Sequence, residues 1–222
     1  MPIGPNTREI GAAMIRSIVF DMDGVLVDAA DCHFEALDRA LALFGHRITR
    51  EQHVARFNGL ATRDKLAILS AERGLPVRLH DLINQLKQDF TQELLPAVAV
   101  PVAAHREAIA QLRAEGYRIG LASNSVRRTV DLVLQRCGLA GLIEVTLSNE
   151  DVTRPKPDPE IYLKAAALLE MPPAACLVVE DNPNGIAAAR AAGAHVMVVR
   201  GLADIHLDSL HHAIAEAGRA AA

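Results

Sequence analysis

Acidic residues follow an apolar segment near the start of the chain, and their types and spacing suit a metal and phosphate site. In IRSIVFDMDGVLVD, residues 15–28, apolar residues lead into Asp21, which is followed by Asp23 and then by Gly24. Ionised carboxylates repel each other and are costly to remove from water. A bound cation would offset that cost, so we expect one beside these acids.

Further polar residues follow other apolar runs of the chain. Ser123 and Asn124 end the run that starts at residue 117, and Glu180 and Asp181 end the run CLVV. Lys156 lies in the proline-rich segment TRPKPDPE. In an open α/β sheet the ligand site lies beyond the carboxyl ends of the strands, so these groups should converge there. Carboxylates, carbonyl oxygens and waters are the ligands that Mg²⁺ prefers.

Such a site could transfer a phosphoryl group. A lysine, hydroxyl or amide donors and Mg²⁺ together bind phosphate oxygens, which would assign that role to Lys156, Ser123 and Asn124. An ionised Asp21 could attack phosphorus and form an aspartyl-phosphate. Asp23 could protonate the leaving alcohol and later activate the water that hydrolyses the intermediate.

The segments that must position these residues alternate between strand and helix patterns. Short, nearly continuous apolar runs, as in parallel strands covered on both faces, occupy residues 15–21, 117–124, 142–149, 176–181 and 195–201. Most of the intervals between the later runs have helical periodicity, which predicts a doubly wound α/β domain with a parallel sheet.

One interval breaks this alternation. Residues 30–96 contain helical patterns without a convincing strand, which predicts a small all-helical cap inserted after the first strand. The catalytic core would then comprise residues 15–29 and 97–222. Residues 1–14 are polar and carry proline and glycine, so we expect a flexible extension there.

Composition excludes several classes of function. The net charge is −4 with no long basic run, so we expect no nucleic-acid partner. No apolar run reaches the length of a membrane span. Three cysteines without a CxxC pair argue against a zinc site or disulfides and suit the cytoplasm. We expect a monomer or weak homodimer that binds a small phosphate ester.

Four stretches in order resemble the motifs of the haloacid dehalogenase superfamily. They are DMDGVLVD (21–28), LASNS (121–125), PKPDPEIY (155–162) and VVEDNPNGIAAARAAG (178–193). Within that superfamily, the chain is most similar to phosphatases and mutases that carry a helical cap after the first motif. The resemblance covers residues 15–201 and implies the same core and cap.

The resemblance also implies roles for individual residues. Asp21 would be the nucleophile and Asp23 the general acid and base, while Ser123 and Lys156 would bind phosphate. The implied Mg²⁺ ligands are the Asp21 carboxylate, the Asp23 backbone carbonyl, Asp181 and, directly or through water, Glu180.

Cap residues would select the substrate. His33 lies where the family contacts substrate, although a histidine on a helix often only packs there. The segment from Asn58 to Arg63 contains a glycine and could reach over the active site, so we expect Asn58 and Arg63 to bind substrate. A simple turn between two helices is the alternative.

Several reactions share this scaffold. A dehalogenase lacks an acid at the position of Asp23, and a phosphonatase needs a cap lysine, for which the sequence gives neither Lys65 nor Lys87 a special environment. A β-phosphoglucomutase carries KGVSRE in the cap loop, where this chain has NGLATR, and a lysine where this chain has Val126. The loss of those cations favours hydrolysis over mutase activity.

The sequence therefore predicts a Mg²⁺-dependent phosphatase acting on a small phosphorylated metabolite, which we expect to be a sugar phosphate. A phosphosugar mutase of the β-phosphoglucomutase type is the alternative. A binding module that keeps the fold without turnover is the alternative outside enzymes.

Overall fold

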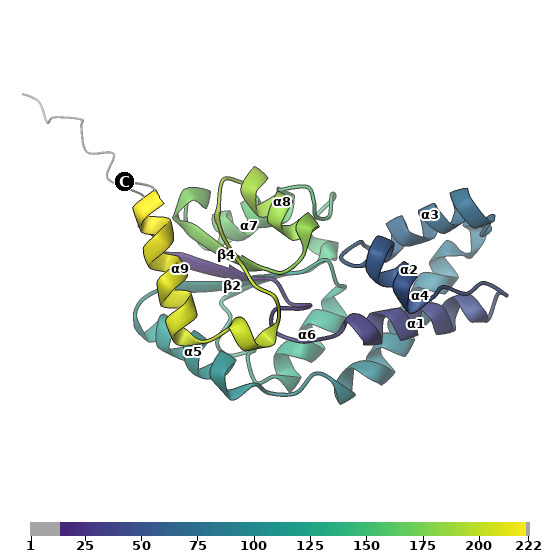
Figure 1. Cartoon of the computed structure of the whole chain (residues 1–222), viewed down its shortest axis with the longest axis horizontal. Coiled ribbons are helices and arrows are strands. Elements are labelled where there is room, and N and C mark those ends of the chain that lie inside the picture. The colour runs from purple at the N-terminus through teal and green to yellow at the C-terminus, as the bar shows by residue number, and fades with distance from the viewer. Residues whose placement is uncertain (1–13, 221–222) are drawn as a thin grey trace, which may run out of the picture.

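The computed structural model describes residues 14–220, and the extension expected at the N-terminus lies almost entirely outside them. Two bodies lie side by side in Figure 1, a sheet with flanking helices and a smaller group of helices at its far end. No helix among the described residues is long and apolar enough to cross a bilayer.

Five parallel strands form one sheet in the order β3-β2-β1-β4-β5. Their bounds are β1 Ser17–Phe20, β2 Arg118–Ala122, β3 Val145–Leu147, β4 Cys176–Glu180 and β5 His195–Val198. Each lies within a run that the sequence pattern assigned to a strand. The central strand β1 pairs with β2 and β4, and Phe20 is in register with Leu121 and Val179. The residues that follow these three positions therefore share one edge of the sheet.

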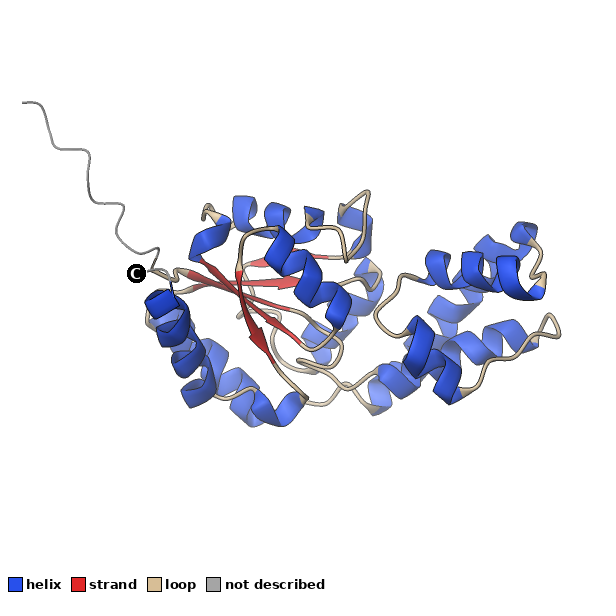
Figure 2. Cartoon of the chain, turned by 45° about the horizontal axis from the view of Figure 1, so that its top comes forward, coloured by secondary structure: helices blue, strands red, loops and turns tan. Residues whose placement is uncertain are grey.

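Helices cover both faces of the sheet (Figure 2). Ile18 and Phe20 of β1 point to the face covered by α5 (Ala103–Ala114), α6 (Arg127–Arg136) and α9 (Leu207–Ala220). Val19 points to the opposite face, where α7 (Glu160–Leu168) and α8 (Pro183–Ala191) pack. Burial on both faces explains the nearly continuous apolar runs. The predicted α/β fold class is confirmed.

The helices between β1 and α5 form the cap. They are α1 (Ala30–Ala42), α2 (Arg50–Gln52), a π-helical turn at His53–Phe57, α3 (Thr62–Arg73) and α4 (His80–Leu94), with short 3-10 turns at Val77–Leu79 and Leu95–Ala97. The cap has its own apolar core, which includes Leu37, Leu66 and Ile83. This core is separate from the two apolar clusters that cover the faces of the sheet.

Candidate active site

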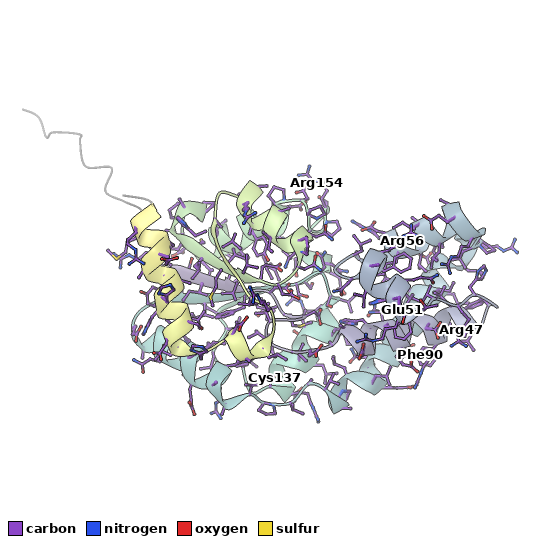
Figure 3. All side chains as sticks on the ribbon, in the orientation of Figure 1. Arg47, Glu51, Arg56, Phe90, Cys137 and Arg154 are labelled. Atoms are coloured by element: carbon purple, nitrogen blue, oxygen red, sulfur yellow. The ribbon has the colours of Figure 1, made fainter. Side chains whose placement is uncertain are left out.

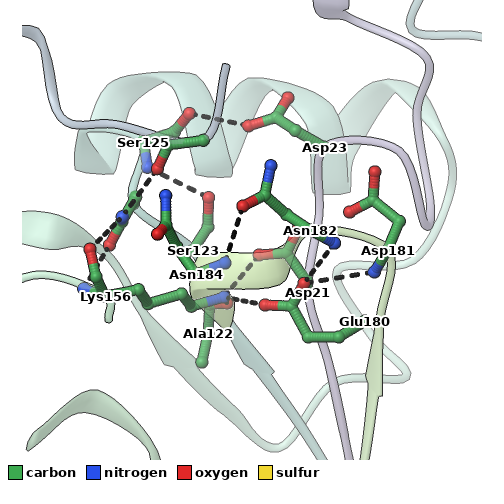
Figure 4. A network of polar contacts seen from close by, with 12 residues as sticks. Asp21, Asp23, Ala122, Ser123, Ser125, Lys156, Glu180, Asp181, Asn182 and Asn184 are labelled. Carbon is green, nitrogen blue, oxygen red and sulfur yellow. Dashed lines mark hydrogen bonds and ion pairs between the residues drawn. The ribbon is translucent and has the colours of Figure 1, made fainter. Parts of the chain in front are cut away.

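The strand ends bring together residues that are far apart in the chain. Asp21 follows β1, Ser123 follows β2, and Glu180 ends β4, with Asp181 next to it. Figure 4 shows the side chain of Lys156, from the loop before α7, reaching into this group. These residues line a cavity of about 280 Å³ between the sheet edge and the cap.

Lys156 lies at the centre of the site. Its buried Nζ donates to Asp21 Oδ1 at 2.6 Å, to Glu180 Oε1 at 2.7 Å and to the carbonyl of Ala122 at 2.9 Å. Burial alone would lower the pKa of Lys156, but Asp21 and Glu180 outweigh it and hold that pKa well above its usual value. Lys156 is therefore an ammonium that fixes the orientation of the Asp21 carboxylate.

Glu180 is bound by the chain on both carboxylate oxygens. Its Oε1 also accepts a hydrogen bond from the Tyr162 hydroxyl at 2.6 Å, and its Oε2 accepts from the backbone N–H groups of Asp181 and Asn182. A Cβ on Gly185 would lie 1.7 Å from Oε1, so this side chain needs a glycine beside it. These contacts show that Glu180 positions Lys156, a role that the sequence did not reveal.

Three carboxylates form a cluster that fits a divalent cation. Asp21, Glu180 and Asp181 each place an oxygen within 4.8 Å of the others. Among residues 14–220, Asp181 Oδ1 is buried without a hydrogen-bond partner. Burial together with Glu180 raises the pKa of Asp181 to about 6. Burial and Glu180 likewise raise the pKa of Asp21. With all three carboxylates ionised, the single Lys156 charge leaves two negative charges, which a divalent ion would balance.

Asp23 lies apart from this cluster, beside Ser125 (Figure 4). Its carboxylate pairs with His33 Nε2 at 3.0 Å and accepts from the Ser125 hydroxyl at 2.9 Å, while Lys87 Nζ lies 3.3 Å from His33 Nδ1. Burial would raise the pKa of Asp23, but His33 and these hydrogen bonds outweigh it and lower that pKa. The sequence predicted roles for Asp23 and His33 but did not identify Ser125 as a partner.

Ser123 and Asn124 play different parts. The buried Ser123 Oγ accepts from the backbone N–H of Ser125 and lines the cavity. The Asn124 side chain accepts from the backbone N–H of Lys156 and donates to the carbonyl of Gly59 in the cap at 3.1 Å. Asn124 therefore joins the lysine loop to the cap.

The loop before α3 lies against the core. Asn58 lines the cavity, and Gly59 has a φ of +76° with its ideal Cβ position 2.5 Å from the side-chain amide of Asn182. Only glycine fits this contact without strain. Arg63 lies outside the cavity, because its side chain is exposed and donates to the carbonyl of Thr153. The structure thus brings Asn58 to the site and leaves Arg63 on the surface.

Two lysines that the sequence did not distinguish are buried in the cap. Lys65 and Lys87 are each 6% exposed, and both line the cavity. Burial lowers the pKa of Lys65 to about 7 and that of Lys87 to about 8. The sequence did not indicate a special environment for either lysine, and the structure shows that both have one.

Comparison with known proteins identifies the family. A model of haloacid dehalogenase-like hydrolases matches residues 18–199. The chain belongs to this family. Its sequence is 31% identical over 185 residues to a phosphorylated carbohydrates phosphatase of Thermotoga maritima, covering 81% of this chain and 82% of that protein. It is 26% identical over 223 residues to a β-phosphoglucomutase of Bacillus subtilis, covering 89% of this chain and 94% of that protein.

The fold agrees with this membership. A β-phosphoglucomutase structure from Clostridium difficile superposes with a TM-score of 0.79 at 20% identity, covering 91% of this chain and 98% of that one. The haloacid dehalogenase-like assignment confirms the resemblance drawn from the four motifs. It also confirms the predicted enzyme class, a phosphoric monoester hydrolase.

Proposed function

We propose that this haloacid dehalogenase-like enzyme is a Mg²⁺-dependent phosphatase that hydrolyses a phosphorylated sugar through an aspartyl-phosphate. The observation that carries the proposal is the arrangement of Asp21, Lys156 and the carboxylate cluster at one sheet edge. A phosphatase relative named for phosphorylated carbohydrates supports the substrate class.

Asp21 and Asp181 would hold Mg²⁺, with the backbone carbonyl of Asp23 and, directly or through water, Glu180. The three-carboxylate cluster supports this assignment, as does the buried Asp181 Oδ1, which has no hydrogen-bond partner among the described residues. The ion would neutralise phosphate charge as the phosphoryl group is transferred.

The chain's own residues supply the remaining steps. Asp21, oriented by Lys156, forms a bond to phosphorus as the bond from phosphorus to the ester oxygen breaks. Asp23 gives a proton to that oxygen and then takes one from the water that attacks the intermediate. Ser123 and Lys156 hold phosphate oxygens during both steps. His33 and Ser125 fix the Asp23 carboxyl group.

The test uses p-nitrophenyl phosphate, a small ester whose hydrolysis does not require specific contacts with the cap. We expect turnover that a chelator abolishes and added Mg²⁺ restores. Asp21→Asn should remove turnover, and acid-quenched protein analysed by mass spectrometry should carry phosphate on Asp21 only in the unmodified enzyme. Asp208→Asn, at an exposed position on α9, is the matched control. Turnover that persists in Asp21→Asn would rule out this mechanism.

A phosphosugar mutase remains a second candidate because two observations favour it. Lys65 and Lys87 supply positive charge in the cavity that the cap loop lacks, and one relative is named a β-phosphoglucomutase. A mutase would convert a hexose 1-phosphate into the 6-phosphate, whereas a phosphatase would release inorganic phosphate and free sugar. Chromatography of the products separates the two outcomes.

We also propose that the enzyme acts in the cytoplasm as a monomer or weak homodimer, without nucleic-acid or membrane partners. The three cysteines are free and buried, which suits a reducing compartment. Light scattering across a range of protein concentrations would test the oligomeric state.

A further inference from the structure

Lys65 is a buried cation that the proposed chemistry does not use. It lies on α3, is 6% exposed and lines the cavity from the cap side. Within residues 14–220 its Nζ forms no hydrogen bond and no ion pair; it is not fully enclosed, so it reaches the cavity, and Asp23 is the acid whose charge acts on it. Lysines are almost never buried without a partner, because the ammonium loses its hydration.

Surface cations of the cap behave differently. The exposed Arg47, Arg50 and Arg56 pair with cap carboxylates, Arg47 with the buried Asp38, and Figure 3 labels Arg47 and Arg56 on the cap. These three exposed arginines are paired with acids, whereas Lys65, which water solvates poorly, forms no ion pair among the described residues and is only partly offset by the charge of Asp23. This contrast indicates that the partner of Lys65 comes from outside the chain.

The surroundings of Lys65 favour an anion. Lys87 lies near enough to lower the pKa of Lys65, in addition to burial. The buried His53 lines the same space, and its Nε2 has no partner in the part of the chain that the structure describes. Burial together with Lys65 lowers its pKa to about 3, so it stays neutral. The lining residues contributed by residues 30–88 include no acid. The cap end of the cavity is therefore cationic, while the sheet end carries the carboxylate cluster.

We propose that Lys65, assisted by Lys87 and His53, forms a second anion-binding subsite, and that the preferred substrates are phosphate esters with a second anionic group remote from the transferred phosphate. The proposal rests on the proposed function for the location of the first phosphate. The second group could be a phosphate or a carboxylate, because both are oxyanions that an ammonium binds.

The test compares esters that differ by one anionic group. Fructose 1,6-bisphosphate is paired with fructose 6-phosphate, and 3-phosphoglycerate with glycerol 3-phosphate. The unmodified enzyme should have the higher kcat/KM for the doubly anionic member of at least one pair. In Lys65→Met that preference should fall on the order of 10- to 100-fold, as expected for the loss of a charge-assisted contact. The pair that responds identifies the second group.

A matched control makes the result decisive. Lys164→Met makes the same chemical change at an exposed position on α7 and should keep the preference. Equal losses of kcat/KM for both members of each pair in Lys65→Met, or no preference in the unmodified enzyme, would overturn the proposal.

A binding measurement separates this proposal from the proposed function. In the Asp21→Asn background, calorimetry should show that Lys65→Met weakens binding of the responsive doubly anionic ester on the order of tenfold or more. It should weaken the matched single-phosphate ester much less. If no ester is hydrolysed by the unmodified enzyme but this difference in affinity is seen, the proposed function fails and the subsite stands. Equal affinities would refute the subsite.

Discussion

A cation held for a ligand should destabilise the enzyme when the ligand is absent, and Lys65→Met measures that cost. The pKa of Lys65 falls from the ordinary 10.5 to about 7, chiefly because of burial and then because of Lys87. At about 1.4 kcal/mol for each pH unit, keeping this ammonium buried at neutral pH lowers the free energy of unfolding by up to about 5 kcal/mol. Water in the cavity and local relaxation reduce the effect, so we expect a gain of about 2 to 4 kcal/mol from the substitution.

The pH dependence distinguishes this electrostatic gain from better packing by methionine. Above pH 7 the folded protein releases the Lys65 proton while the unfolded chain keeps it up to pH 10.5. The unfolded state then binds more protons, so the free energy of unfolding of the unmodified enzyme rises with pH across this range. The advantage of Lys65→Met should therefore be largest at pH 7 and shrink toward pH 10.5.

Urea unfolding at a series of pH values provides the measurement, in buffers free of phosphate and sulfate because these anions would occupy the cavity. Lys164→Met, at an exposed lysine, should change stability by less than about 0.5 kcal/mol at every pH. A gain in Lys65→Met that does not vary with pH would mean that packing, and not the buried charge, causes it. The absence of any gain would refute the electrostatic argument.

Three further substitutions test the site. Lys156→Met leaves the buried Glu180 and Asp21 facing each other without a counter-charge. Urea unfolding in the presence of a chelator should therefore show a free energy of unfolding lower by about 3 to 5 kcal/mol. A loss below about 1 kcal/mol would contradict the central role of this lysine. Gly59→Ala places a residue with a Cβ at a φ of +76° and brings that Cβ against the side chain of Asn182. Steady-state kinetics should therefore show kcat/KM about 5- to 30-fold lower, with little change in the stability of the core. Tyr162→Phe removes the hydroxyl donor to Glu180 and should lower the free energy of unfolding by about 1.5 to 3 kcal/mol. An unchanged urea midpoint would mean that this hydrogen bond does not stabilise the fold.

Motif order and strand periodicity predicted the core of the site because both depend on local sequence. The parallel register places the residues after Phe20, Leu121 and Val179 at one edge, so strand ends alone brought Asp21 close to Asp181. The role of Tyr162 could not be found in this way. Its hydroxyl meets Glu180 through the packing of α7 on the sheet, which no local pattern specifies.

Helical periodicity could have distinguished the buried Lys65 from Arg63, which the sequence predicted as a substrate contact. On α3, Lys65 is buried in line with Leu66 and Leu69, whereas Arg63 lies on another face and is exposed. On α4, Lys87 is buried one turn from Ile83 and one turn from Thr91. Positions three and four residues apart share a helix face, so a lysine in an apolar row was the available signal.

The opposite charges at the two ends of the cavity link substrate choice to the position of the cap. Lys65 and Lys87 repel each other, and the contact of Gly59 with Asn124 holds the cap loop against the core. A doubly anionic ester would offset the repulsion only when the cap is closed, because the lysines come from the cap and the phosphoryl site from the sheet. A singly anionic ester leaves that repulsion in place and stabilises closure less. Because closure also excludes water from the site, the second anion should raise kcat as well as lower KM.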